Sequence, residues 1–236
     1  MAGKSGKAPT VVILAAGLGT RLGRRHPKPL TQLRDGRTIL QQQLDHIRTD
    51  LRRRTRVVIV VGYKKELIME AAASDAAFVY NDLFDETNTS KSLLRALRMA
   101  PSGGVLWMNG DVVFTPGLLA FLRGEVAGGS FVAVNTERVA EEEVKYTLDD
   151  DGHIAQLSKE VVGGLGEAIG INYVTAADRK LLARHLHDVN AGDYFEKGIE
   201  DAIMKSGLKI RAVDVSQFGV VEVDFDDDLD RANQLD

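Results

Sequence analysis

Residues 11–23 read VVILAAGLGTRLG, and the architecture expected for the whole chain follows from them. The first four residues are apolar and mostly β-branched, which predicts a short buried strand. Small residues follow without a break, with glycines at positions 17, 19 and 23. Small residues after a buried strand let backbone N–H groups approach a phosphate chain, so the stretch predicts a phosphate-binding loop at the end of a strand.

Two kinds of nucleotide site use such a loop. A dinucleotide site is one interpretation, because Asp35 follows the glycines at nearly the distance of a ribose-binding acid. The glycines of that motif open a helix directly, however, whereas Pro27 and Pro29 interrupt the chain here. Arg21 and Lys28 also suggest a ligand with more negative charge, such as a triphosphate. Three further basic residues fit a solvated loop equally well: Arg24, Arg25 and His26.

Short apolar runs alternate with helical patterns through the first half of the chain, as in a parallel sheet with crossover helices. The expected strands, apolar enough to be buried on both faces, are 11–14, 57–61, 78–80, 105–108 and 131–134. The expected helices are 39–51, 64–73, 90–100 and 116–124. Gln42 and Gln43 are assigned to the polar face of the first helix, and Thr115 is assigned as the N-cap of the last.

The pattern changes after about residue 140, where 144–157 reads as a β-hairpin. The later elements are expected as strands 168–174, 210–215 and 220–223, helices 176–187 and 194–205, and a terminal helix. The predicted class is therefore α/β, a Rossmann-like, mixed and mainly parallel sheet flanked by helices. We expect residues 1–9 to be a flexible N-terminus and 10–236 to form a single domain.

Composition excludes several functional classes. The 236 residues include no cysteine, which rules out disulfides, thiolate zinc sites and a cysteine nucleophile. A net charge of −4 disfavours general nucleic-acid binding. The longest apolar run, 11–18, is too short to span a membrane, and residues 1–9 lack the apolar region of a secretory signal. We expect a soluble, cytoplasmic protein with no membrane or nucleic-acid partner.

Two motifs resemble those of the nucleotidyltransferases that make sugar nucleotides and CDP-alcohols. The first is LAAGLGTRL followed by PKPL, and the second is the stretch from Asn81 to Leu94, NDLFDETNTSKSLL. The short gap between Arg21 and Lys28 is similar to that of the inositol-phosphate and phosphocholine cytidylyltransferases. The resemblance implies a GT-A-like nucleotidyltransferase fold, with an NTP-binding part at about 10–140 and an acceptor-binding part at about 141–236.

The resemblance assigns the nucleotide contacts. The loop wraps the NTP phosphates, and Arg21 and Lys28 neutralise charge on the departing pyrophosphate. The nucleotide-binding residues expected from the resemblance are Leu14, Ala15, Ala16, Gly17, Gly19, Thr20, Asn81, Asn88, Ser92 and Gly110. Helix capping through Thr89 or Ser90 is the structural alternative for the Asn and Ser cluster, and it accounts for only part of that cluster.

Two aspartates are the candidate Mg²⁺ ligands. Asp111 follows strand 105–108, at the sheet edge where ligands of such folds bind, although a turn aspartate is the alternative interpretation. The resemblance places a metal-binding Asp at this strand end and assigns Asp224, in the ending VEVDFDDDL, as the second ligand. Glu222 is a possible substitute. Aspartates 226–228 are expected in the first turn of the terminal helix, where they favour its dipole.

The acceptor site is also assigned by resemblance. Lys159, in the stretch GHIAQLSKE, faces the acceptor phosphate, with a solvated loop lysine as the alternative. Three residues around the strand 168–174 are expected to line the acceptor pocket: Glu167, Asn172 and Tyr173.

These residues predict a Mg²⁺-dependent nucleotidyltransferase without a covalent intermediate. The preferred reaction transfers CMP from CTP to a small phosphorylated acceptor such as phosphocholine, and pyrophosphate leaves. An aromatic cage for a quaternary ammonium could draw on Phe84, Trp107, Tyr146, Tyr173 and Tyr194. The alternatives are inositol phosphate, aminoethylphosphonate or a sugar-1-phosphate as acceptor, with UTP or dTTP as donor. A nicotinamide dehydrogenase, a non-catalytic nucleotide-binding domain and a homo-oligomer are also left open.

Overall fold

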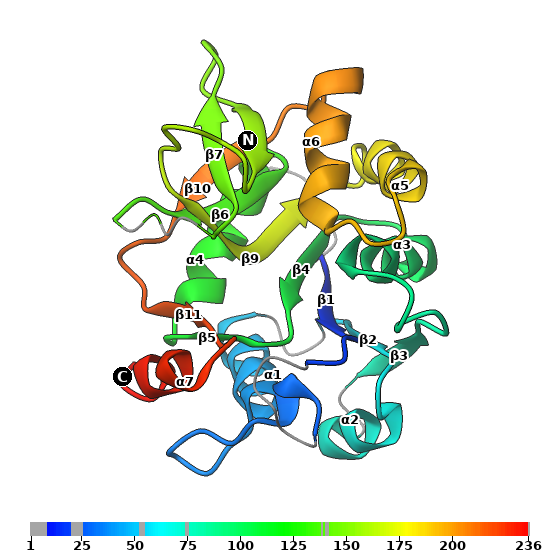
Figure 1. Cartoon of the computed structure of the whole chain (residues 1–236), viewed down its shortest axis with the longest axis vertical. Helices are drawn as coiled ribbons and strands as arrows, with labels where there is room; N and C mark the ends of the chain where they lie inside the picture. The colour runs from blue at the N-terminus through cyan, green and yellow to red at the C-terminus, as the bar shows by residue number, and fades with distance from the viewer. Residues whose placement is uncertain are drawn as a thin grey trace, which may run out of the picture.

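The central strand of the molecule is β1 (Thr10–Ala15), and every one of its residues is buried. A computed structural model describes residues 9–19, 26–51, 55–73, 76–137, 139 and 142–235 (Figure 1). Residues 1–8 of the predicted N-terminal segment lie outside the described residues, as do Thr20 and Arg21. Parallel strands flank β1, with β2 (Val57–Val61) on one side and β4 (Val105–Asn109) on the other. The phosphate-loop strand is therefore shielded by neighbours on both sides.

The main sheet has the order β10-β6-β9-β4-β1-β2-β3, with the hairpin β7–β8 attached to β9. Strand β9 runs antiparallel to both β4 and β6, so the sheet is mixed as predicted. The remaining strands of this sheet are β3 (Ala77–Tyr80), β6 (Phe131–Asn135), β7 (Lys145–Leu148), β8 (Ile154–Ser158), β9 (Glu167–Val174) and β10 (Arg211–Asp214). The predicted fold class is confirmed.

Helices cover both faces of the sheet (Figure 1). One face packs against α1 (Ile39–Asp50), α2 (Lys65–Ala72) and α4 (Leu118–Glu125). The other face packs against α3 (Thr89–Met99), α5 (Arg179–Asp188) and α6 (Phe195–Ser206). Two short 3₁₀ segments, η2 (Lys28–Leu30) and η3 (Val126–Gly128), complete these layers. No helix in the described part of the chain is long and apolar enough to cross a membrane.

A small two-stranded sheet forms a separate layer from segments that are distant in sequence. Strand β5 (Val112–Phe114), which the sequence analysis did not predict, pairs antiparallel with β11 (Val220–Glu222). Helix α7 (Asp226–Ala232) follows and holds the three aspartates 226–228 in its first turn, as predicted. This pairing carries the C-terminal segment to the end of β4.

Four details of the sequence prediction are corrected. Strand β3 is an edge strand with partly exposed residues, because it pairs with β2 alone. Helix α4 begins at Leu118 after Gly117 rather than at a Thr115 cap. Helix α3 is capped by Asn88, whose Oδ1 accepts from the Thr89 N–H at 2.8 Å. Gln42 and Gln43 are buried, at 9% and 0% exposure, and are not on a solvent face.

Gly110 lets the end of β4 approach β1, and this close contact can be tested. A Cβ at Gly110 would lie 2.8 Å from the Leu14 carbonyl oxygen and 2.9 Å from Pro29 Cγ. We expect Gly110→Ala to lower the free energy of unfolding by about 1–3 kcal/mol, because well-packed atoms must move. Urea denaturation followed by circular dichroism measures this. A Cβ at Gly17 would meet nothing within 4 Å, so Gly17→Ala, as the control, should stay within about 0.5 kcal/mol of the parent.

Candidate functional site

A lysine joins the two aspartates that the sequence analysis selected as a pair. Lys28 Nζ lies 3.3 Å from Asp111 Oδ2 and also forms a short ion pair with Asp224 Oδ1. The lysine is separated from these partners by 83 and 196 positions in the sequence. All three side chains are largely buried, with 12%, 19% and 25% exposure for Lys28, Asp111 and Asp224. The fold therefore assembles one charged group from three distant segments.

Asp111 is positioned by the turn between β4 and β5. The Gly110 N–H donates to the Leu14 carbonyl at 2.9 Å, which fixes the turn against the end of β1. From α1, Gln43 Nε2 donates to the carbonyls of Asn109 and Val112, at 2.9 and 2.8 Å. The turn is thus held on both sides, and the Asp111 carboxylate is directed away from the sheet edge toward Lys28.

Asp224 is positioned by the small sheet. Glu222 pairs with Val112, and the Val223 N–H donates to the Asp111 carbonyl at 2.9 Å. The Asp228 carboxylate accepts from the Asp224 N–H at 3.0 Å and so anchors the segment to the start of α7. The residue that precedes Asp224 is therefore hydrogen-bonded to the backbone of Asp111, the other candidate metal ligand.

The glycine loop contacts Lys28. Gly19 has a φ of +61°, a left-handed conformation that favours glycine, and a Cβ there would lie 2.8 Å from Lys28 Cγ. At the start of the loop, the Ala16 carbonyl accepts from the Tyr63 N–H at 3.1 Å. The structure therefore brings the described part of the loop, Lys28 and the two aspartates together. The roles predicted for Thr20 and Arg21 fall on residues outside the described chain.

Burial and electrostatic interactions shift the pKa values of Lys28 and Asp111. Burial raises the pKa of Asp111, Lys28 opposes that rise, and Asp224 adds to it by repulsion. For Lys28, burial alone would lower the pKa, but attraction by the two aspartates outweighs it and the pKa is raised. Lys28 is therefore a permanent cation that stabilises two neighbouring carboxylates in an environment poor in water.

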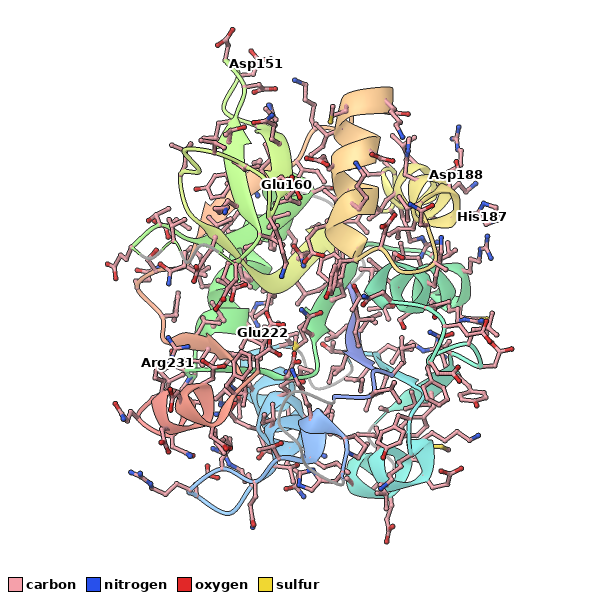
Figure 2. The ribbon with its side chains drawn as sticks, viewed as in Figure 1. Asp151, Glu160, His187, Asp188, Glu222 and Arg231 are labelled. Carbon is pink, nitrogen blue, oxygen red and sulfur yellow. The ribbon has the colours of Figure 1, made fainter. Side chains whose placement is uncertain are left out.

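Oxygen atoms around Asp111 fit a hard divalent cation. Glu222 Oε1 accepts from Asn109 Nδ2 at 3.4 Å, and Figure 2 shows Glu222 near the centre of the molecule. Asn109 Oδ1 is buried and has no hydrogen-bond partner in the described residues. Carboxylate and amide oxygens are the ligands that Mg²⁺ accepts. The donor set of Asp111, Asp224, Glu222 and Asn109 is thus chemically suited to that ion.

A second acidic group, Glu143, Glu196 and Glu222, interacts with the first. Burial raises the pKa of Glu222 well above its usual value, and Asp111, Glu143, Asp224 and Glu196 add to the rise by repulsion. Burial also raises the pKa of Glu196 to about 7, against the attraction of Lys159. For Glu143, burial is again the main cause of a raised pKa, and Lys159 opposes it. This part of the molecule therefore carries more carboxylates than cations among the described residues.

Lys159, the lysine predicted to face the acceptor, attracts both Glu143 and Glu196. Its side chain is exposed, and Nζ lies 5.5 Å from the centre of the Tyr194 ring. Glu167 begins β9 opposite Lys145 and repels Glu143. Contact of either residue with an acceptor stays a prediction.

Asn172 and Tyr173 lie farther from the aspartates than the sequence analysis expected. Because β9 is antiparallel to β4, its first residues approach the end of β4 and its last residues the beginning. Tyr173 is in the core, where its ring packs on Phe131 with centroids 5.5 Å apart and fills the space above Gly104. The structure therefore does not bring Tyr173 to the site. Asn172, opposite Trp107, is 1% exposed, and neither of its amide atoms has a hydrogen-bond partner in the part of the chain that the structure describes.

The polar residues predicted to contact the base have structural partners. Asn81 is fully buried, and its Nδ2 donates to Thr87 Oγ1 at 3.0 Å and to Ser92 Oγ at 3.1 Å. Its Oδ1 accepts from the Leu83 N–H at 3.2 Å. Asn88 caps α3 and donates through Nδ2 to the Gly192 carbonyl at 3.2 Å. Nucleotide contact by Asn81, Asn88 or Ser92 stays a prediction. Such a contact would replace hydrogen bonds that these side chains now make within the protein.

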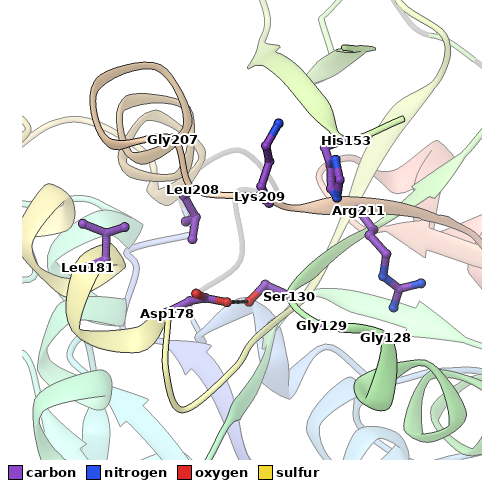
Figure 3. A pocket seen from close by; sticks show the side chains of 10 residues that line it. All are labelled: Gly128, Gly129, Ser130, His153, Asp178, Leu181, Gly207, Leu208, Lys209 and Arg211. Carbon is purple, nitrogen blue, oxygen red and sulfur yellow. Dashed lines mark hydrogen bonds between the residues drawn. The ribbon is translucent and has the colours of Figure 1, made fainter. Parts of the chain in front are cut away.

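A cavity of about 380 Å³ lies near the starts of β6 and β10, at the other end of the strands from Lys28 and the two aspartates (Figure 3). It is lined by Ser130 and Asp178, which share a 2.6 Å hydrogen bond, and by His153. His153 also belongs to a trio with Asp149 and Asp151 in the β7–β8 turn. Lys209 neutralises both aspartates, at 2.9 and 3.6 Å, so this trio is a turn stabilised by an ion pair.

Sequence reasoning missed three residues of the site. Gln43 was detectable, because it lies three positions after Leu40 and four before Ile47, in the middle of the apolar stripe of α1. A polar residue in such a stripe indicates a buried hydrogen bond. Glu143 and Glu196 gave no such signal, because a surface glutamate on a loop or in a first helical turn is common.

Comparison with known proteins places these features in context. The model of a MobA-like NTP transferase domain matches residues 11–189. The chain is 30% identical over 233 residues to CMP-5'-(3-aminopropyl)phosphonate synthase of Streptomyces rubellomurinus, covering 90% of this chain and 36% of that protein. It is 26% identical over 237 residues to 2-aminoethylphosphonate cytidylyltransferase of Lancefieldella rimae, covering 94% of this chain and 91% of that protein. The chain thus spans about a third of the first relative and most of the second.

A solved structure shares the fold at low sequence identity. The CTP:phosphocholine cytidylyltransferase of Streptococcus pneumoniae superposes with a TM-score of 0.75 at 18% identity, covering 96% of this chain and 98% of that one. The shared fold includes the mixed sheet and both helical layers.

The raised pKa of Glu196 predicts a pH-dependent stability effect. Glu196 has a pKa of about 7 in the folded protein, above the ordinary value of 4.5, so the folded protein binds more protons than the unfolded chain between these pH values. Stability is therefore lost as pH rises through this window. We expect Glu196→Gln to raise the melting temperature at about pH 8 and to change it little at about pH 4.5. The exposed Glu66, at the same position of α2, provides the control Glu66→Gln. Equal shifts at both pH values would contradict the prediction.

Proposed function

This chain belongs to the MobA-like NTP transferase family, and from that premise we propose that it transfers CMP from CTP to a small acceptor carrying a phosphonate or phosphate group and an amine. The observation that carries the proposal is the convergence of Lys28, Asp111 and Asp224 beside the glycine loop. A cation and paired carboxylates beside a phosphate-binding loop are what transfer from a nucleoside triphosphate requires.

The choice of acceptor rests on the charges next to this group. Glu143, Glu196 and Glu222 favour a cation, and two relatives carry aminoalkylphosphonates in their names. A quaternary ammonium would need an aromatic cage. Of the residues considered for it, Trp107, Tyr146 and Tyr173 are buried in the core at 1%, 3% and 9% exposure. The contacts therefore favour an aminoalkylphosphonate over phosphocholine.

The proposed reaction is a direct in-line displacement. An oxygen of the acceptor phosphonate attacks the α-phosphorus of CTP, and the bond from that phosphorus to the bridging oxygen of the β-phosphate breaks. Pyrophosphate leaves with the electron pair, and CMP is joined to the acceptor. A phosphate-type acceptor has a second pKa near ~6, so it is largely a dianion at neutral pH and needs no general base.

The residues of the chain supply position and charge. Lys28, held beside the loop, stabilises the negative charge that develops on pyrophosphate, and Arg21 is proposed for the same task. Lys159 attracts the acceptor anion toward the triphosphate. Backbone N–H groups of residues 14–19 and Gly110 are proposed to line the nucleotide, in an NTP-binding part of about 10–140. The acceptor-binding part is proposed at about 141–236.

Asp111 and Asp224 are proposed to hold Mg²⁺, with Glu222 and Asn109 as further oxygen donors. When bound, the ion supplies charge stabilisation to the phosphate oxygens. The carboxylates hold the ion, and the hydrogen bond from Val223 N–H to the Asp111 carbonyl keeps their two segments in register.

Removing a charge from the central group tests its role. We expect Lys28→Met and Asp111→Asn each to lower kcat by about 10²–10³-fold, because a preorganised charge is lost where charge develops. Pyrophosphate release and circular dichroism would be measured together. Asp227→Asn, in the exposed first turn of α7, is the control and should keep the parental rate. Near-parental turnover in the Lys28 or Asp111 variant, with the fold intact, would refute the assignment.

A substrate panel tests the choice of donor and acceptor. Pyrophosphate release is measured with CTP, UTP, dTTP and ATP against 2-aminoethylphosphonate, phosphocholine, inositol-1-phosphate and glucose-1-phosphate. We expect the highest kcat/KM for CTP with 2-aminoethylphosphonate. A preference for UTP or dTTP with the sugar phosphate would support a sugar-1-phosphate nucleotidyltransferase instead. Nucleotide binding without release in any pair would indicate a non-catalytic domain.

Metal removal gives a further prediction. Dialysis against EDTA should abolish pyrophosphate release, and added Mg²⁺ should restore it, because the clustered carboxylates need a cation to accept a triphosphate. Mn²⁺ binding, followed by electron paramagnetic resonance, should be weaker in Asp224→Asn than in the parent. Unchanged activity after exhaustive chelation would exclude the metal role.

A further inference from the structure

We propose that Glu143 and Glu196 bind the ammonium group of the acceptor and thereby select aminoalkylphosphonates over phosphonates that lack an amine. This inference rests on the proposed function, and it assigns specificity to two residues that lie outside the sequence motifs of the chain. It predicts a two-point recognition of the acceptor, with its anionic end toward Lys159 and Lys28 and its cationic end toward the glutamates.

The two glutamates come from elements on either side of the acceptor part. Glu196 is the second residue of α6, and Glu143 lies just before β7. In the β7–β8 hairpin Lys145 pairs with Ser158, which brings the residues just before β7 alongside those just after β8. Lys159, the residue after β8, has its Nζ 5.5 Å from the centre of the ring of Tyr194, the N-cap of α6. The two glutamates therefore flank the predicted acceptor lysine, which attracts both of them.

Neither glutamate has an ion-pair partner within 4 Å among the described residues. Neighbouring acids of the same helix differ in this respect: Glu200 pairs with Lys197 at 3.2 Å, and Asp201 pairs with Lys205 at 2.7 Å. The helix thus neutralises its other buried acids from within. Glu143 and Glu196 are half-buried. A half-buried carboxylate that lacks a cation bears part of the cost of burying a charge, and a ligand cation would offset that cost.

A second, independent observation is a set of unpartnered polar groups near the start of α6. Asn172 is 1% exposed, and both atoms of its amide lack hydrogen-bond partners among the described residues. The indole N–H of its cross-strand neighbour Trp107 also lacks one, and the Trp107 ring meets Phe195, the residue before Glu196, with centroids 5.7 Å apart. Unused hydrogen-bonding groups therefore lie under the start of α6, on the face that holds Asn109 and its Glu222 contact.

Glu196 would change its protonation state when the ammonium binds. With a pKa of about 7 it is only partly ionised at neutral pH in the free protein. The charged groups facing it are Glu143 before β7, Lys159 after β8 and Glu222 on β11. A bound cation favours the ionised carboxylate, so acceptor affinity should rise as pH increases from about 6 to 8.

The experiment compares two acceptors that differ only in the amine. CMP transfer from CTP to 2-aminoethylphosphonate and to ethylphosphonate is measured for the parent, Glu196→Gln, Glu143→Gln and the double variant, with Glu66→Gln as control. The parent should prefer the amine by about 10²-fold or more in kcat/KM, since a site built to bind a polar group rejects the analogue lacking it. Each glutamine variant should reduce that preference at least tenfold, because it raises KM for 2-aminoethylphosphonate. KM for CTP and the rate with ethylphosphonate should stay within about twofold.

The pH profile separates recognition from a structural role. KM for 2-aminoethylphosphonate should fall more between about pH 6 and 8 in the parent than in Glu196→Gln. Comparing the two proteins with the same acceptor cancels the titration of its phosphonate. An unchanged preference in both variants, or an equal loss with both acceptors, would overturn the inference and leave the proposed function standing. Transfer to neither acceptor by the parent would overturn the proposed function, and with it the inference.

Discussion

The ion pairs of Lys28 with Asp111 and Asp224 are the interaction on which the site depends. Two carboxylates in a largely buried position repel each other, and burial raises the pKa of Asp111. Lys28 offsets both effects because it is itself held at low exposure by the glycine loop and the turn at Pro29. A buried charge that loses its partner is strongly destabilising, so the positions of the loop, the β4–β5 turn and the C-terminal segment are mutually constrained.

The small β5–β11 sheet explains how residues so distant in sequence can share one site. Pairing of Glu222 with Val112 and the hydrogen bond from Val223 to Asp111 place the C-terminal segment against the β4–β5 turn. Gln43 supports the same turn from α1. Hydrogen-bonded elements thus hold the segments of Asp111 and Asp224, which keeps their charges preorganised without a large entropy loss on binding.

The part of the chain proposed to bind the acceptor differs in its charges from the part proposed to bind the nucleotide. Cations and backbone N–H groups suit the phosphate chain, whereas Glu143, Glu196 and Glu222 accumulate negative charge a short distance away. Such a gradient matches a substrate that is anionic at one end and cationic at the other. The same scaffold could accept other phosphorylated molecules if these carboxylates were replaced, which is how related sites on one fold acquire different specificities.

The sequence by itself determined the positions of most strands in the first half and the glycine-rich segment after the first of them, because apolar runs and small-residue motifs are local signals. The resemblance of its motifs to those of a known family selected Lys28, Asp111 and Asp224. Strand β5 was missed since three apolar residues after a turn resemble any buried loop, and β3 was misjudged because exposure at an edge depends on its neighbours. Only the tertiary structure decided that Gln43 is buried and that Asn81 and Asn88 have hydrogen-bond partners within the protein. It also decided that Tyr173 lies in the core, away from the aspartates, and that Glu143 and Glu196 interact with Glu222. Those facts depend on contacts between distant segments, and the antiparallel direction of β9 has no signature within the strand itself.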